Sequence, residues 1–174
     1  MAKKIKFLAG DLKAMSRKIT ERVKEILPQV VAVEGLNHFE ESWDNQGFTD
    51  SGLTKWQGRK APSVTTTKKG KATSRYKRWK EKDAGRAILI SHQTDTQGTH
   101  LKDTLRVVKS KRKVIFSSDK AYAEVHNEGG RSGRGAGFMM PRRQFMGPSK
   151  VLDKKIEKKL TTEIRKTLIK ALTQ

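Results

Sequence analysis

The sequence predicts an α+β protein, in which an antiparallel β-sheet (a meander) is covered by an N-terminal and a C-terminal amphipathic helix and carries a long basic arm. Three observations predict this class. Apolar residues recur at steps of three and four near both ends of the sequence, which is the period of an amphipathic helix. Short apolar runs between them, separated by turn-length pieces, are typical of antiparallel strands. No strand–helix–strand alternation occurs, so a parallel sheet is not expected.

Length and composition limit the possible classes of protein. The 174 residues suit a single domain, residues 1–174, of which only 34% are hydrophobic and 33% are charged. The absence of Cys excludes a disulfide framework and a thiolate metal site. No apolar run approaches the roughly 20 residues of a membrane span, so no membrane partner is expected. The formal net charge of +21 favours polyanions or acidic proteins as partners.

The first helix is predicted over residues 11–46. Its apolar stripe continues through Phe39 and Trp43, and Gly47 is a plausible stop. Pro28 lies inside the pattern, where it should kink the helix or split it in two. The stripe consists of Leu12, Met15, Ile19, Val23, Ile26, Val30, Val33 and Leu36.

The basic arm is predicted over residues 54–86. This segment carries twelve basic and two acidic side chains, a net charge of +10, and its central part has no apolar periodicity. Such a segment is too polar to bury itself, and its basic and aromatic side chains suit phosphates and stacked bases. An equally supported alternative is that the arm orders against a neighbouring subunit. The candidate polyanion-binding residues are Lys68, Lys69, Lys71, Arg75, Tyr76, Lys77, Arg78, Trp79 and Lys80.

Antiparallel strands are predicted over residues 87–127. The pieces between the last three runs are short enough for hairpin turns, so 101–127 is predicted as a meander. One face of that sheet needs covering, and the two amphipathic helices are available to cover it. The runs are 87–91, 99–110, 113–118 and 121–127.

A Gly-rich loop is predicted over 128–140, followed by a helix over 149–172. The loop should be mobile in the free protein because ordering it costs entropy, and 141–147 should dock beside it as an anchor. Ser149 can cap the helix, whose apolar residues recur at a spacing of four. We expect Leu160 and Ile164 to face the same core as Ile19 and Val23.

Catalytic, metal and cofactor chemistry finds little support in the sequence. The four His show no metal-binding spacing, and residues 126–128, His-Asn-Glu, lack the further ligands that a metal nuclease needs. The Gly-rich stretch does not end in the Gly-Lys-Ser/Thr of a phosphate-binding loop. The prediction is therefore a protein that is not an enzyme, with no catalytic residues, no metal site and no cofactor.

Several segments in a fixed order carry a family resemblance. They run from NHFEESWDNQGF (37–48) and a later Trp with QGRK (56–60) to ILIS (88–91) and HLKDTLRV (100–107). The most specific are YAEVHNEGG (122–130) and MPRRQFMGPS (140–149), just before the terminal helix. Together, over roughly residues 36–172, the sequence resembles the phage virion morphogenesis, or tail completion, family of Mu-like phages and prophages.

The resemblance implies a structural or assembly protein of the phage particle. Such proteins act at the neck or tail terminus and join head to tail, and related connectors form rings. Expected partners are therefore other phage neck or tail proteins and further copies of the chain, in a virion assembled in the host bacterial cytoplasm. The alternative is a non-specific nucleic-acid-binding basic protein, which the charge of +21 favours.

The stretch around Pro141 is the candidate assembly interface. Met, aromatic and Arg side chains are enriched at interface cores, and a Gly-rich loop reshapes at little strain. The alternative for Phe145 and Met146 is that they only lock the last helix onto its own sheet. The candidate interface residues are His126, Asn127, Glu128, Gly129, Gly130, Pro141, Arg142, Arg143, Phe145 and Met146.

Overall fold

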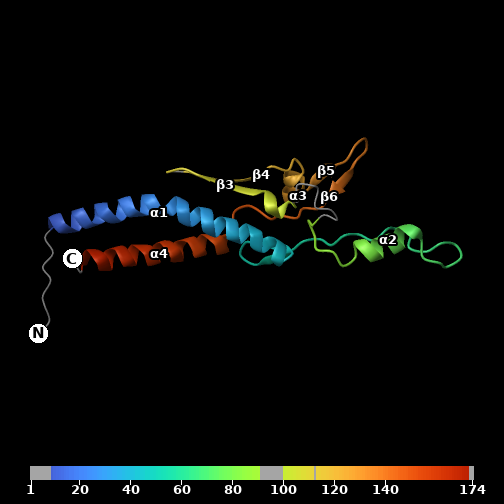
Figure 1. The fold of residues 1–174 in the computed structure, drawn as a ribbon, viewed down its shortest axis with the longest axis horizontal. Coiled ribbons are helices and arrows are strands. Elements are labelled where there is room, and N and C mark those ends of the chain that lie inside the picture. The colour runs from blue at the N-terminus through green and yellow to red at the C-terminus, as the bar shows by residue number, and fades with distance from the viewer. Residues whose placement is uncertain (1–8, 91–99, 112, 173–174) are drawn as a thin grey trace, which may run out of the picture.

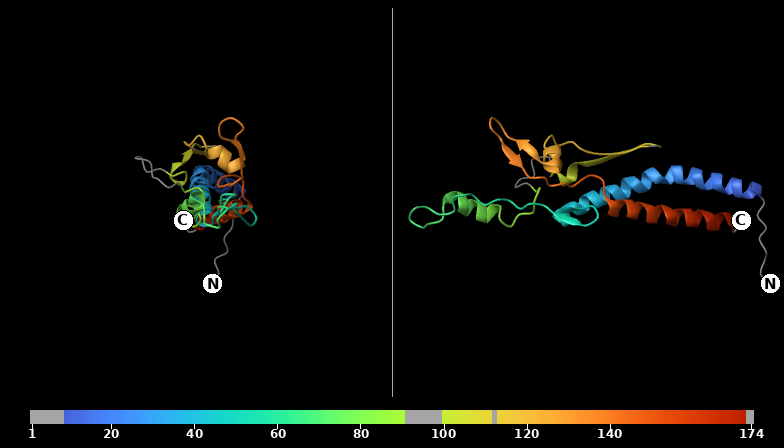
Figure 2. Two further views of the ribbon diagram at one scale, coloured as in Figure 1. Left: turned by 90° about the vertical axis from the view of Figure 1, so that its right-hand side faces the viewer. Right: turned by 180° about the vertical axis from the view of Figure 1, so that it is seen from behind.

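The computed structural model describes residues 9–90, 100–111 and 113–172 (Figure 1). It is an α+β structure, as predicted. Two long helices, α1 and α4, run side by side from one end, and residues 57–86 extend toward the other end (Figures 1 and 2). In chain order the elements are α1 (Ala9–Asp44), β1 (Gly47–Thr49), β2 (Leu53–Lys55), α2 (Ser74–Lys82), the 3-10 turn η1 (Lys102–Thr104), β3 (Leu105–Lys109), β4 (Val114–Ser118), α3 (Ala123–Glu128), β5 (Gly130–Ser132), β6 (Phe138–Met140) and α4 (Lys150–Leu172).

Both predicted long helices are present. Pro28 was predicted to kink the first helix or to split it in two, and of these the split does not occur, because α1 continues through Pro28 to Asp44. Gln46 then adopts a positive φ of 48° and turns the chain into β1. Ser149 caps α4 as predicted, since its Oγ accepts a hydrogen bond from the Leu152 amide at 3.1 Å.

Helix α1 is the central layer of the fold. On one side it packs against α4, and two lysines of α4 pair with its acidic residues: Lys155 with Glu41 at 2.9 Å and Lys159 with Glu34 at 3.6 Å. On the other side it packs against the β3–β4 hairpin (Figure 1). Gly35 permits this approach, because a Cβ there would collide with the ring of Phe116.

The predicted single meander is wrong in its extent. Within the described residues, the strands form three separate two-stranded antiparallel sheets, β1–β2, β3–β4 and β5–β6. Only β3 and β4 belong to the predicted meander, with Leu105 opposite Ser118 and Lys109 opposite Val114. The predicted strand over 99–110 therefore begins later, after the turn η1, and residue 99 lies outside the described residues.

The predicted strand over 121–127 is also wrong, because this segment contains helix α3. Its alternating pattern is short, and a run of this length is compatible with either period. Tyr122, just before the helix, and His126 within it are four positions apart, and their rings meet edge to face at 5.7 Å. Gly129 ends the helix with a φ of 77°.

Residues 87–90 form no strand, contrary to the prediction for 87–91, and residue 91 lies outside the described residues. Side chains take the backbone groups that a neighbouring strand would otherwise bind. Arg59 donates to the carbonyls of Ala87 and Ile90, and the side-chain oxygen of Gln46 accepts from the Ile88 amide. Leu89 has a φ of 58°, which is incompatible with an extended strand.

The Gly-rich segment 128–140 is not a loop throughout. It forms the β5–β6 hairpin, in which Gly130 pairs with Met140 and Ser132 with Phe138. The segment predicted as a basic arm contains β2 and the short helix α2, which Thr73 caps by accepting from the Tyr76 amide. A helix there was not predicted, because only nine residues adopt it and none of them is buried.

The core consists of two small clusters where the elements meet. One contains Phe39 of α1, Phe48 of β1 and Leu152 of α4, with Phe116 of β4 packed against it. Both long helices and the β3–β4 hairpin thus share this cluster. The other cluster consists of Trp43, Trp56, Leu101, Ala123 and Phe145.

Candidate functional site

The linker between β6 and α4, residues 141–149, is anchored by Phe145. This side chain is fully buried, with 0% of its surface exposed, and its ring lies 5.0 Å from that of Trp43. Trp56 packs edge to face on Trp43 at 5.8 Å and donates from Nε1 to the Gln144 carbonyl at 2.6 Å. The Phe145 carbonyl accepts from Ser42 Oγ at 3.3 Å. The end of α1 and the residue after β2 therefore meet the linker, about 90 to 100 residues later in the sequence, at one aromatic residue.

Asn127, at the end of α3, holds the backbone of the same linker. Its Oδ1 accepts from the amides of Phe145 at 2.9 Å and Met146 at 3.0 Å, and its Nδ2 donates to the Met146 carbonyl at 3.0 Å. One amide side chain thus satisfies three backbone groups, as a neighbouring strand would. The adjacent His126 carbonyl accepts from the Arg143 amide at 2.8 Å.

The two consecutive arginines of the linker have different surroundings. Arg143 is buried, with 9% of its surface exposed, and its Nε donates to the Gln57 carbonyl at 3.1 Å. Burial lowers the pKa of this guanidinium. Arg142 is exposed, donates to Gln144 Oε1 at 2.8 Å and lies 3.7 Å from Glu128 Oε2. The pair therefore offers one internal and one external cation.

Gly129 allows the linker to lie against α3. A Cβ at this position would lie 3.0 Å from the Arg142 amide nitrogen, and the φ of 77° is in the range that favours glycine. The beginning of the β5–β6 hairpin and the linker are therefore held in close contact at this residue.

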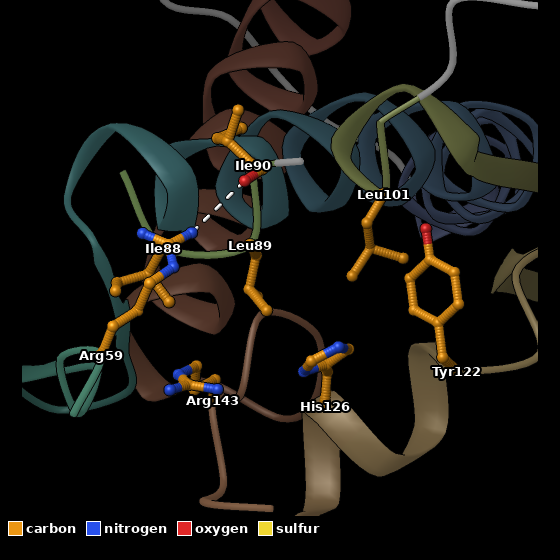
Figure 3. A pocket seen from close by; sticks show the side chains of 8 residues that line it. All are labelled: Arg59, Ile88, Leu89, Ile90, Leu101, Tyr122, His126 and Arg143. Carbon is orange, nitrogen blue, oxygen red and sulfur yellow. Dashed lines mark hydrogen bonds between the residues drawn. The ribbon is translucent and has the colours of Figure 1, made fainter. Parts of the chain in front are cut away.

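A pocket of about 420 Å³ lies beside the buried arginine (Figure 3). Arg59, Arg143 and His126 converge on it, and apolar side chains complete its lining. Burial lowers the pKa of His126, and the neighbouring Arg143 lowers it further. The apolar lining residues are Ile88, Leu89, Ile90, Leu101 and Tyr122.

A match to a known family covers most of this arrangement, although Ser42 and Trp43 of α1 lie before the matched range. The model of the phage virion morphogenesis family matches residues 54–165, from β2 through the linker into α4. The chain belongs to the phage virion morphogenesis family. No curated protein and no solved structure matches it. Family membership supports a structural or assembly role in the phage particle and suggests a virion component.

The structure brings most of the predicted interface of this morphogenesis protein together around one linker. Phe145 and Arg143 are buried within the chain, whereas Arg142 and Glu128 are exposed. The remaining residues are half-buried, and an assembly role for the set stays a prediction. They are His126, Asn127, Gly129, Gly130, Pro141 and Met146.

The residues of the site that were not predicted as functional include Trp56, Gln57 and Arg59. They lie in the segment assigned to the basic arm, although Trp56 is buried and Arg59 is half-buried. Trp56 and Arg59 belong to one of the segments that carry the family resemblance, and that resemblance was the signal available. Charge and composition gave no sign that these residues pack against the linker, because the segment around them is mostly exposed and basic.

The predicted polyanion-binding residues of this morphogenesis protein lie on α2 and the turn before it. Tyr76 and Trp79 stack on each other, with ring centroids 5.8 Å apart and planes 22° apart. Each ring therefore has one face covered by the other. The basic side chains of the set, Lys68, Lys69, Lys71, Arg75, Lys77, Arg78 and Lys80, are all exposed.

The described part of the chain has neither a metal-binding cluster nor a helix that could span a membrane. In residues 9–90, 100–111 and 113–172, no group of three His, Asp or Glu side chains is placed to hold a metal ion. None of the helices described there is both long and apolar enough to cross a lipid bilayer.

Proposed function

We propose that this protein joins phage head to tail by self-association, as a ring at the neck or the tail terminus, and without enzymatic activity. The observation that carries the proposal is its large surface. The accessible surface of the chain is 13372 Å², whereas a compact monomer of 19.7 kDa exposes roughly 8600 Å². An extended subunit of this kind suits burial against neighbouring subunits.

Exposed apolar side chains on the projecting elements support the same proposal. Val33 of α1 and Ile169 of α4 are 57% and 63% exposed. On the outer face of the β3–β4 hairpin, Val108 and Ile115 are opposite one another and both exposed. Apolar area distributed over several elements favours more than one neighbour, as in a ring.

The charge distribution favours a heterologous contact between copies, in which two different surfaces of the subunit meet. Residues 1–53 carry eight basic and eight acidic side chains, whereas residues 54–86 have a net charge of +10. A two-fold contact through the basic segment would place like charges together. A contact between unlike segments avoids that repulsion, and heterologous contacts are those that close rings.

The first test is a phage lacking this protein, examined by electron microscopy. Separate, complete heads and tails are expected. Normally joined particles, or a block before heads or tails form, would contradict head–tail joining.

The second test is sedimentation velocity of the purified protein at several concentrations, which should show oligomers. Loss of the oligomers in Val33→Asp but not in Gln29→Asp would map the contact to α1. Gln29 is an exposed residue of the same helix.

Non-specific DNA contact by α2 is a second candidate function. Five of its nine residues are basic, one is acidic, and all five basic side chains are exposed. Binding by counterion release should weaken steeply with salt and show little sequence preference. Replacing Arg75, Lys77 and Arg78 with Gln should flatten the salt dependence. Replacing three exposed cations of α4 should not, and these are Lys154, Lys158 and Arg165.

A further inference from the structure

Arg143 is a buried cation without a counter-ion in the part of the chain that the structure describes. Its Nε donates to the Gln57 carbonyl, and its Nη1 lies 3.5 Å from Met140 Sδ. Neither is a charged partner, and no carboxylate of the described residues forms an ion pair with it. A buried charge is costly unless it is paired, so the surroundings of Arg143 favour an anion.

A second guanidinium strengthens that preference. Arg59 lines the same pocket, and its terminal nitrogens donate to the carbonyls of Arg86, Ala87 and Ile90. Burial lowers the pKa of Arg59, and the neighbouring Arg86 and Arg143 lower it further, with Asp83 opposing. The hydrogen bonds fix the guanidinium in place but leave its charge uncompensated by the carbonyls.

The other walls of the pocket are apolar. Leu89 points toward the space between Arg143 and His126, and Leu101 and Tyr122 lie on the far side (Figure 3). A volume of about 420 Å³ falls within the size of pockets that enclose a small ligand. The lining therefore suits a group that is anionic at one end and apolar along its body.

Two kinds of virion component carry anions, nucleic acid and protein. Phosphates lie on the outside of a polymer and favour exposed cations such as those of α2, not a pocket with apolar walls. An Asp or Glu carboxylate at the end of a side chain can enter such a pocket, and the flat guanidinium of Arg143 suits its two oxygens. The geometry thus favours a protein carboxylate.

We propose that the pocket between Arg59, Arg143 and His126 receives an acidic side chain, flanked by apolar residues, from a protein partner in the virion. This inference rests on the proposed function for the kind of partner. It adds to that function a defined binding pocket, of which Arg143 in the linker is one wall. The charged ligand enters from outside, whereas Phe145 and Asn127 hold the linker from within.

The test uses the full chain and 4-methylpentanoate as the probe, with 4-methylpentanamide as its neutral twin. The readout is the pKa of His126, followed by NMR of its imidazole. Because Arg143 lowers this pKa, a bound carboxylate that offsets the cation should raise it. The rise should saturate with 4-methylpentanoate at millimolar concentrations and be absent with the amide. Inorganic phosphate at the same ionic strength should have little effect.

Two consecutive arginines provide a matched pair of variants. Arg143→Gln should weaken 4-methylpentanoate binding by about tenfold or more, and Arg142→Gln should leave it unchanged. A second pair of variants, at Tyr122, keeps the test valid if Arg143→Gln does not fold. Tyr122 lines the pocket but is 45% exposed, so replacing it should preserve the fold. Tyr122→Glu should block the probe with its own carboxylate, whereas Tyr122→Gln should retain binding.

Several outcomes would overturn the proposal. Equal binding of acid and amide would make the pocket merely apolar, and tighter binding of phosphate would make it a phosphate site. If the pKa of His126 stays unchanged at the highest 4-methylpentanoate concentration, or if Arg143→Gln binds 4-methylpentanoate as tightly as the wild type, the pocket does not bind a carboxylate through Arg143. None of these results depends on head–tail joining, which the phage lacking the protein tests separately.

Discussion

The junction, where Trp43, Trp56 and Phe145 pack together, and the free end of the α1–α4 helix pair, at the start of α1 and the end of α4, are built in opposite ways. At the junction, Trp43, Trp56 and Phe145 come from α1, from the residue after β2 and from the linker before α4, and they are at most 8% exposed. At the free end, Leu12 of α1 and Ile169 of α4 are 50% and 63% exposed. The difference indicates that the junction stabilises the isolated subunit, whereas the α1–α4 helix pair presents surface that neighbouring chains can cover.

Polar contacts follow the same division. Junction side chains bind backbone groups about 20 to 100 residues away, as Asn127 does for Phe145 and Met146 and as Ser149 Oγ does for the Thr49 carbonyl at 2.8 Å. Farther from the junction, α1 has local pairs such as Arg22–Glu25, three residues apart on an exposed surface. Such exposed pairs contribute little to stability.

The comparison is tested most strongly by Phe145→Ala. Removing a fully buried ring from the junction should lower the free energy of unfolding by about 3–5 kcal/mol, measured by urea denaturation. The matched control is Phe138→Ala, because Phe138 is 56% exposed on β6 and should change stability by less than about 0.5 kcal/mol. Similar losses in the two variants would refute a junction centred on Phe145.

The next largest effect is expected for Asn127→Ala. It leaves the Phe145 and Met146 amides and the Met146 carbonyl without their partner, at a cost on the order of 2–3 kcal/mol. Asn37→Ala, at an exposed position of α1, is the control and should be near neutral. If Asn127→Ala melts like the wild type, water replaces the side chain and the linker is held by Phe145 alone.

The long helices could be predicted from the sequence because their periodicity extends over many turns. The strands were predicted less well, since the segments are short and one of the predicted strands instead binds side chains from elsewhere in the chain. Residues 87–90 are held by Arg59 and Gln46, a relation that no local pattern encodes. The stripe of the first helix was only partly right: Leu12 and Val33 are exposed, and the side that packs on β4 includes Gly35.

The candidate site shows the same limit. Its linker could be singled out because Pro141, Arg142, Arg143 and Phe145 form an unusual local sequence. The burial of Arg143 and the pocket beside it depend on Gln57 and Arg59, more than 80 residues earlier. A sequence cannot distinguish Arg142 from Arg143 when only their packing against a distant segment separates them.

A charged residue introduced between α1 and α4 tests how much the helix pair itself contributes to stability. Leu160 is half-buried on α4, and the prediction that it faces the same core as Ile19 and Val23 of α1 is testable by Leu160→Asp. The expected loss of stability is on the order of 2 kcal/mol, smaller than at the junction because the site is not fully buried. Lys158→Asp, at an exposed position of the same helix, is the control. No loss in Leu160→Asp would make this face an assembly surface.

The smallest effect concerns pH, and it acts at the end of α1 nearest the junction. His38 is 2% exposed, its Nε2 is 2.9 Å from the Thr49 carbonyl, and its Nδ1 is 3.8 Å from Glu41 Oε2. Burial lowers the pKa of His38 from 6.5, the Thr49 carbonyl raises it, Lys155 lowers it, and Glu41 raises it. The folded state therefore binds its proton less readily than the unfolded state does.

The sign of the pH dependence follows from this difference in proton binding. Below about pH 6.5 the unfolded state binds more protons, so the free energy of unfolding should decrease as the pH falls toward the lowered pKa of His38. Above that range its contribution is fully present. His126 has the same direction of shift, so the wild type should be compared with His38→Gln by urea denaturation between about pH 7.5 and 5. His38→Gln should show a shallower pH dependence. An equal dependence would mean that His126 or the carboxylates set the pH response and that the α1 site is insensitive to protonation.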